Sequence, residues 1–289
     1  MQDRKAFTED EAGMGKRDTY RDVLLHLIDG FLGTGSEEEV TEYLSSNSNL
    51  PGPRGNLELA YAFAEAVEDR SAGDPHKVWE LAKRLSSILA SEAPVNDPKE
   101  FLSFCGAISI GAIGSVHKAF SKSAFGLLKK MADDSRWRMR EGVAMGIQKL
   151  VAKQGQSALK ELDGWIGENE WLSMRAVAAG VAEPALLKDG KTARIALELH
   201  KKIFDRVLAA KARKSDEFKT LRQALGYSLS VVVSATPEAG FKYLRRLIDT
   251  KDADILWVVK ENLKKNRLTR SFPSEVTEME RRLIQEPRH

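Results

Sequence analysis

Apolar residues recur at helical spacing along most of the chain. An early example is the stripe formed by Tyr20, Val23, Leu24, Leu27 and Ile28, which lies on one face of a helix with 3.6 residues per turn. Strand signals are nearly absent, because the Asp-Gly pairs of the chain sit within or beside helical patterns and not between two alternating runs. The pattern predicts an all-α protein.

Turn and capping residues divide this pattern into separate helices. The loop at residues 50–56 holds two prolines and two glycines, and its last residue, Asn56, is predicted to cap a helix over 57–69. We expect this loop to have a structural role. Two Asp-Pro pairs, at 74–75 and 97–98, predict helices near 75–91 and 98–119, since proline is tolerated in the first helical turn.

Three glycines in the second of these helices predict close packing. Gly106, Gly111 and Gly114 lie in an otherwise apolar segment. Each glycine costs a helix about 1 kcal/mol relative to alanine. We therefore expect neighbouring helices to approach closely at these positions.

The chain becomes self-similar from about residue 121. Each repeat has a first helix, an acidic or polar turn, and a second helix that opens with a large apolar residue and carries a basic residue about one turn later. The aligned basic residues are Arg140, Arg175, Arg222 and Lys260, separated by 35, 47 and 38 residues. Such spacing is typical of stacked helical hairpins, with an enlarged third unit. We expect the recurring basic residue to bond to an acid or a turn carbonyl of a neighbouring repeat.

These second helices resemble HEAT repeats of the kind found in the DNA alkylation repair group, which includes alkylpurine glycosylase-like proteins. The resemblance covers roughly residues 121–268. It implies an α-α superhelix, a HEAT-like (armadillo-like) solenoid of antiparallel helical hairpins. We expect an acidic N-terminal helical region of degenerate hairpins at 1–120 and basic HEAT-like repeats at 121–289, forming one continuous solenoid. Proteins of this architecture include scaffolds, transport factors, enzymes and DNA glycosylases.

Charge is distributed unevenly between these two regions. Residues 1–100 hold 11 basic and 20 acidic residues, a net charge of −9, whereas residues 101–289 hold 34 and 22, a net charge of +12. Such asymmetry fits an anionic partner, either a protein or a nucleic acid. We favour the simpler interpretation, in which lysine-rich helix faces are merely solvated.

Motifs for catalysis and cofactor binding are mostly missing from the sequence. No histidine precedes a glutamate or lies four residues from another histidine, and no phosphate loop is present. A single cysteine, Cys105, excludes a disulfide within the chain and favours a cytoplasmic location. No apolar run is long enough for a membrane span, and the polar N-terminus is unlike a signal peptide. We expect no metal, no cofactor and no catalytic residue. His26 is expected to pack among apolar residues.

The candidate binding residues are the aromatic and basic positions of the second helices: Trp137, Arg138, Arg140, Trp171, Arg175, Lys219, Arg222, Trp257, Lys260 and Lys264. For the tryptophans, packing between hairpins is the favoured alternative. The leading hypothesis is a non-enzymatic scaffold that binds a macromolecular partner on its concave face. The alternative is a DNA-binding or glycosylase-like protein acting on alkylated bases, for which Trp137/Glu141 and Trp257/Glu261 pair an aromatic ring with a carboxylate. The Trp-rich run and following Asp of the glycosylases are missing.

Overall fold

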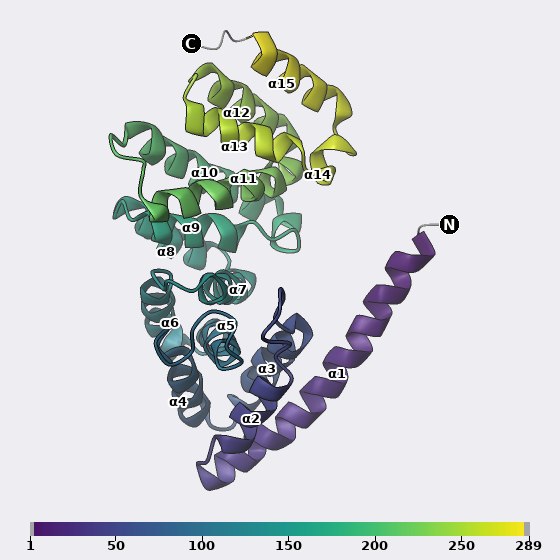
Figure 1. Cartoon of the computed structure of the whole chain (residues 1–289), viewed down its shortest axis with the longest axis vertical. Helices are drawn as coiled ribbons and strands as arrows, with labels where there is room; N and C mark the ends of the chain where they lie inside the picture. The colour runs from purple at the N-terminus through teal and green to yellow at the C-terminus, as the bar shows by residue number, and fades with distance from the viewer. Residues whose placement is uncertain (1–2, 286–289) are drawn as a thin grey trace. The chain divides into compact units, whose positions relative to one another are not determined.

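The computed structural model describes the backbone of residues 3–285 and the side chains of residues 15–284 (Figure 1). Helices joined by short turns make up this part of the chain, and none of its residues lies in a β-strand. The chain divides into two compact units, residues 1–153 and 154–289. The predicted all-α class is confirmed. The boundary near residue 121 remains a prediction, because it marks where the repeat pattern becomes recognisable and not where the compact units meet.

The first unit contains seven helices within its described residues (Figure 1). Helix α3 packs against both α1 and α5, and α5 also packs against α4 and α6. Helix α5 lies at the centre of the unit, since every residue from Glu100 to Ser115 is buried. The bounds are α1 Asp3–Thr34, α2 Glu38–Ser46, α3 Leu57–Arg70, α4 Pro75–Ser86, α5 Glu100–Val116, α6 Lys118–Met131 and α7 Trp137–Gln154.

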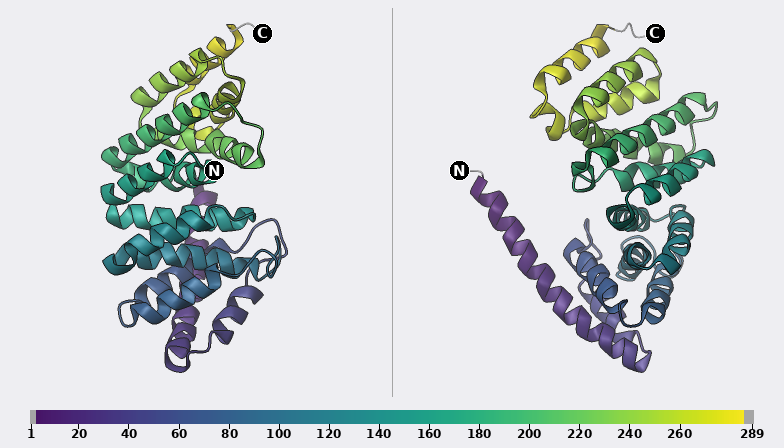
Figure 2. Two further views of the ribbon diagram at one scale, coloured as in Figure 1. Left: turned by 90° about the vertical axis from the view of Figure 1, so that its left-hand side faces the viewer. Right: turned by 180° about the vertical axis from the view of Figure 1, so that it is seen from behind.

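The second unit stacks three helical hairpins, α8/α9, α10/α11 and α12/α13, and ends with α14 and α15 (Figure 2). The second helices lie side by side, because α11 packs against both α9 and α13. The third predicted repeat is enlarged because α10 and α11 have 20 residues each. The bounds are α8 Gln156–Gly167, α9 Trp171–Val181, the 3-10 turn η1 Leu186–Lys188, α10 Gly190–Ala209, α11 Asp216–Ala235, α12 Pro237–Asp249, α13 Ala253–Leu263, α14 Asn266–Thr269 and α15 Pro273–Gln285.

Two of the three predicted caps lie at the start of a helix. The Asn56 side chain accepts the Leu59 N–H (3.2 Å) at the start of α3, and Asp74 accepts the Lys77 N–H (3.0 Å) at the start of α4. The predicted helices at 75–91 and 98–119 are both too long: α4 ends at Ser86 and α5 begins at Glu100. The segment between them is an irregular connector, residues 87–99, whose carbonyls bond to a distant arginine as described below.

The glycines of α5 pack closely against other helices, as predicted. A Cβ added at Gly111 would lie 2.3 Å from the carbonyl oxygen of Gly146 in α7, and one at Gly106 would lie 2.4 Å from the Ser86 backbone nitrogen in α4. Only glycine permits these approaches, because any side chain there would overlap backbone atoms.

The expectation that His26 packs among apolar residues is wrong, since His26 is exposed. The buried histidine is His200, in α10. Its Nδ1–H donates to the Ala196 carbonyl (2.9 Å), and its Nε2 accepts the Ser228 hydroxyl (3.0 Å). Burial lowers the pKa of His200 from 6.5 to about 4, against a smaller opposing effect of the Ala196 hydrogen bond.

This histidine makes stability depend on pH. Below pH 6.5 the unfolded chain binds a proton on His200, whereas the His200 side chain of the folded protein stays neutral down to about pH 4. The free energy of unfolding therefore decreases as the pH falls through that window. The loss amounts to about 3 kcal/mol in total. Urea unfolding between pH 7 and pH 4.5 measures it, with His200→Gln as the non-titrating control. An equal decline in both proteins over this range would rule out His200 as its source.

Candidate functional site

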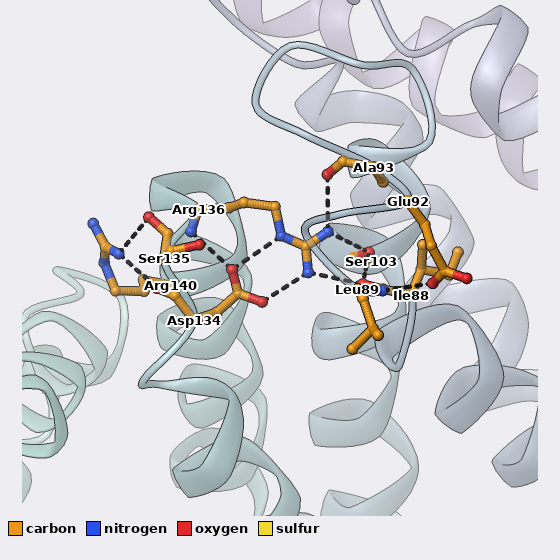
Figure 3. A network of polar contacts seen from close by, with 9 residues as sticks. All are labelled: Ile88, Leu89, Glu92, Ala93, Ser103, Asp134, Ser135, Arg136 and Arg140. Carbon is orange, nitrogen blue, oxygen red and sulfur yellow. Dashed lines mark hydrogen bonds and ion pairs between the residues drawn. The ribbon is translucent and has the colours of Figure 1, made fainter.

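Arg136 is a buried arginine that bonds to several segments of the first unit (Figure 3). Its side chain is 2% exposed, and it donates from Nε (2.9 Å) and one Nη (2.7 Å) to the Asp134 carboxylate. Its other bonds reach the Ile88 carbonyl (2.9 Å), the Ala93 carbonyl (3.2 Å) and the Ser103 hydroxyl (3.2 Å). These bonds use all five N–H donors of the guanidinium. Arg136 therefore holds the connector in place and has no donor left for a ligand.

Arg138, in the first turn of α7, has a similar role. It is 4% exposed and donates to the Glu100 carboxylate (2.9 Å), the Asn96 side-chain oxygen (2.9 Å) and the Gly52 carbonyl (2.7 Å). Its guanidinium carbon lies 4.4 Å from the centroid of the Trp137 ring, which is itself 44% exposed. Arg138 thus anchors the loop at residues 50–56, consistent with the structural role expected for that loop.

The recurring basic residues do not all bond in the same way. Arg140 donates to the Asp134 (2.6 Å) and Ser135 (2.9 Å) carbonyls of the turn before its own helix. Arg222 donates to Asp254 of the next hairpin (2.6 Å), as expected. Arg175 is buried and Lys260 is exposed. The expectation of a bond to a neighbouring repeat therefore holds for Arg222.

The exposed sides of α11 and α13 form one surface in the second unit. The two helices are held in register by Asn262, which accepts the Ser230 N–H (2.6 Å) and donates to the Leu225 carbonyl (2.8 Å). Gly226 faces Trp257, since a Cβ added there would lie 3.2 Å from the indole ring. We name this surface the α11–α13 face and define it by eight residues: Lys219, Arg222, Gln223, Tyr227, Trp257, Lys260, Glu261 and Lys264.

An ion-pair network fixes the first turn of α13 against α11. Arg213 makes two bonds to the Asp252 carboxylate (2.8 and 2.6 Å), and Asp254 contacts both Arg213 (3.6 Å) and Arg222 (2.6 Å). Burial would raise the pKa of Asp252, but the Arg213 bonds and two backbone N–H groups outweigh it and lower that pKa. The Arg222 guanidinium lies 4.6 Å from the centroid of Trp257. Trp257 is therefore held between Arg222 and Gly226.

Much of the positive charge on this face is paired. Lys219 bonds to Asp216 (2.8 Å), and Lys264 bonds to Glu261 (2.5 Å). Exposed pairs of this kind contribute about 0–1 kcal/mol each, so a partner can replace them at little cost. Lys260 makes no ion pair with any described residue.

The ten candidate binding residues are divided between the two units. Trp137, Arg138 and Arg140 belong to the first unit, and Arg222, Trp257, Lys219, Lys260 and Lys264 share the α11–α13 face of the second. Trp171 is half-buried and packs edge-on against Phe218, with ring centroids 5.2 Å apart. Burial removes Arg138 and Arg175 from direct contact with a partner in this conformation.

Sequence reasoning missed Gln223 and Tyr227. They extend the exposed row of α11 that begins with Asp216 and Lys219, at spacings of three to four residues. This helical period could have identified them once the buried face of α11 had been assigned.

A separate groove lies in the first unit, with a volume of about 720 Å³. Its apolar wall includes Ile88, Leu89 and Met131, and Leu89 is 62% exposed. Among the residues that line it, Lys83 bonds to Glu80 (2.9 Å), and Arg136 bonds to Asp134. These pairs leave little net charge at the groove to select a partner.

Comparisons with known proteins give little more. No protein family matches the sequence, and no curated protein matches it. Among solved structures, a designed armadillo repeat protein matches over 77% of this chain and 98% of its own, with 15% identity and a TM-score of 0.28. A similarity this low adds nothing to the fold described above. The narrower resemblance to the alkylation repair group finds no support in these comparisons. The described residues include no helix able to cross a membrane and no group of three metal-binding side chains.

Proposed function

We propose that this protein is a non-enzymatic binding protein that takes a macromolecular partner, in the first place another protein, on the α11–α13 face. The observation that carries the proposal is the row of exposed side chains Lys219, Gln223, Tyr227 and Lys260 on two helices that Asn262 holds in register. The fold does not need these side chains for its core. We further propose a cytoplasmic location, because the only cysteine, Cys105, is buried and cannot form a disulfide within the chain.

The aromatic residues of the face suit protein recognition. Tyr227 is 37% exposed, and Trp257 is partly exposed while held between Gly226 and Arg222. Tyrosine, tryptophan and arginine are the residue types that most often dominate binding energy at interfaces. A ring already fixed in position loses little conformational freedom when a partner binds.

The carboxylates of the face support binding in preference to catalysis. Glu261 is bonded to Lys264, and Asp254 is bonded to Arg222. A surface carboxylate in a short-range ion pair is an ordinary feature of helix faces. Both carboxylates are therefore accounted for by ion pairs within the face, without a catalytic role.

The alternative function is DNA binding or excision of an alkylated base. One observation favours it: residues 255–272 hold five basic residues and a single carboxylate, and phosphate contacts depend on such charge. Incubation with methylated duplex DNA tests for excision. We expect no release of methylated purine. Release that Glu261→Gln abolishes would replace the proposed function with a glycosylase activity.

Site-specific photo-crosslinking tests the proposed function directly. A photo-reactive amino acid is placed at Gln223 or Lys260, and at Lys242 of α12 as an exposed control. In the cells that make the protein, we expect the same adduct at both positions on the face and not at Lys242, with a protein identified in it by mass spectrometry. Absence of an adduct, or the same adduct at Lys242, would contradict the proposal.

A further inference from the structure

Positive charge is concentrated at the end of the α11–α13 face. We name Lys260, Lys264, Lys265, Arg267 and Arg270 the basic arm, which runs from the last turn of α13 to the end of α14. All are exposed except Lys265, which is half-buried, and the only carboxylate between residues 255 and 272 is Glu261. The arm therefore presents a local excess of positive charge.

Two acidic side chains of α13 and α15 are already paired with cations outside the arm. Glu278 of α15 bonds to Arg245 of α12 (2.8 Å) and to Arg282 (3.2 Å). These two arginines lower the pKa of Glu278 to about 2, while burial has a smaller opposing effect. The Glu278 carboxylate is therefore ionised and already paired with the two arginines. Asp254 is held by Arg222 in the same way. Apart from Lys264, which bonds to Glu261, the cations of the arm make no ion pair with a described residue and can be neutralised by a partner.

The surroundings of the arm distinguish between two kinds of anion. Asp216 of α11 and Asp254 and Glu261 of α13 lie on the two helices of the face, each ion-paired with a cation of that face. Duplex DNA carries a charge about every 1.7 Å along its axis, so a phosphate backbone laid along these helices would meet carboxylates as well as cations. The charges of a peptide are further apart than those of DNA. Its acidic residues can face the cations while its uncharged residues lie against the carboxylates.

An apolar anchor beside the arm also fits a peptide. Trp257 lies one turn before Lys260 and Glu261 in α13, and its ring is held against Gly226. Helix α13 has 11 residues, so its axis spans about 16 Å. An extended segment of about five residues covers that length. A segment of that length on α13 passes Trp257 and Lys260, and a longer segment is needed to reach Arg267 in α14.

We propose that the partner segment is an acidic peptide with one aromatic or aliphatic anchor, bound along α13 and α14 with its carboxylates on the basic arm and its anchor on Trp257. This inference rests on the proposed function and adds the chemistry of the partner. Lys260 and Arg267 provide direct charge recognition, because both are exposed and neither is ion-paired with a described residue.

Phage-displayed 12-residue peptides of matched composition test this chemistry. Three pools carry glutamate, glutamine or lysine at four fixed positions, and all other positions are random. Each pool is selected on the full chain, on Lys260→Glu/Arg267→Glu, and on the control Lys191→Glu/Lys242→Glu, which changes charge equally on exposed positions of α10 and α12. We expect the glutamate pool alone to be enriched, and its best peptide to bind at least about 10-fold more weakly to the first variant and unchanged to the control.

Each other outcome overturns the inference in a recognisable way. Equal enrichment of the glutamine pool would refute acidic recognition but leave binding on this face intact. Tighter binding of a 24-base-pair duplex, lost in the same variant, would assign the arm to nucleic acid. No enrichment of any pool would refute a peptide partner, while the crosslinking at Gln223 separately decides whether the face binds anything.

Discussion

Arg138→Met is expected to lower the free energy of unfolding by about 3–5 kcal/mol, because it leaves a buried carboxylate without its cation. Glu100 is 0% exposed and bonds to Arg138 at 2.9 Å. The substitution also removes the donors that hold the Asn96 side chain and the Gly52 carbonyl. Urea unfolding followed by circular dichroism measures the loss.

Two further variants separate the charge effect from loss of packing. Arg138→Met/Glu100→Leu removes both charges and should regain much of the lost stability, because an apolar pair of similar volume often replaces a buried ion pair without penalty. Arg140→Met removes bonds to two turn carbonyls at a half-buried position and should cost about 1 kcal/mol. A loss for Arg138→Met no larger than that for Arg140→Met would show that the buried pair is not important for stability.

Gly111→Ala is the second substitution with a large expected effect, a loss of about 3 kcal/mol. The new Cβ would lie 2.3–2.5 Å from the carbonyl oxygen, Cα and carbonyl carbon of Gly146, and backbone atoms cannot move aside as a flexible side chain can. Overpacking a core costs roughly 1–3 kcal/mol and occasionally more. The gain of about 1 kcal/mol in helix propensity is too small to offset it. Thermal and urea unfolding measure the change.

Gly126→Ala in α6 is the matched control, because a Cβ there has no neighbour within 4 Å. It should stabilise the protein by up to about 1 kcal/mol through helix propensity alone. If Gly111→Ala stabilised the protein as Gly126→Ala does, α5 and α7 could not be packed through their backbones as described.

The helical hairpins were predictable from the sequence because their signals are local. Asn56 and Asp74 cap the helices that follow them, and the apolar period identifies the buried faces. The connector at residues 87–99 was not predictable. Its Ala93 and Ile88 carbonyls bond to Arg136, which lies 43 and 48 residues further along the chain. The local helical pattern contains no information about such a contact, and a prediction from that pattern therefore extends the helix to residue 91.

The candidate site was predicted only in part for the same reason. The sequence has arginine at positions 136, 138 and 140, around the start of α7, and its pattern does not distinguish them. In the structure Arg136 and Arg138 are buried, and Trp137 between them is exposed. Burial depends on the partners that each side chain finds in distant segments, such as Glu100 and Gly52. Likewise Gln223 and Tyr227 become candidates only after the packing of α11 against α9 and α13 is known.

Hydroxyl-radical footprinting of the complex tests most directly whether the α11–α13 face is the binding surface. The measurement compares side-chain oxidation with and without the protein partner captured by crosslinking. We predict that oxidation decreases at Tyr227 and Trp257 and is unchanged at Trp137 and Leu89, which are exposed in the first unit. Protection of Trp137 and Leu89 with Tyr227 and Trp257 unchanged would contradict the account and place binding in the first unit.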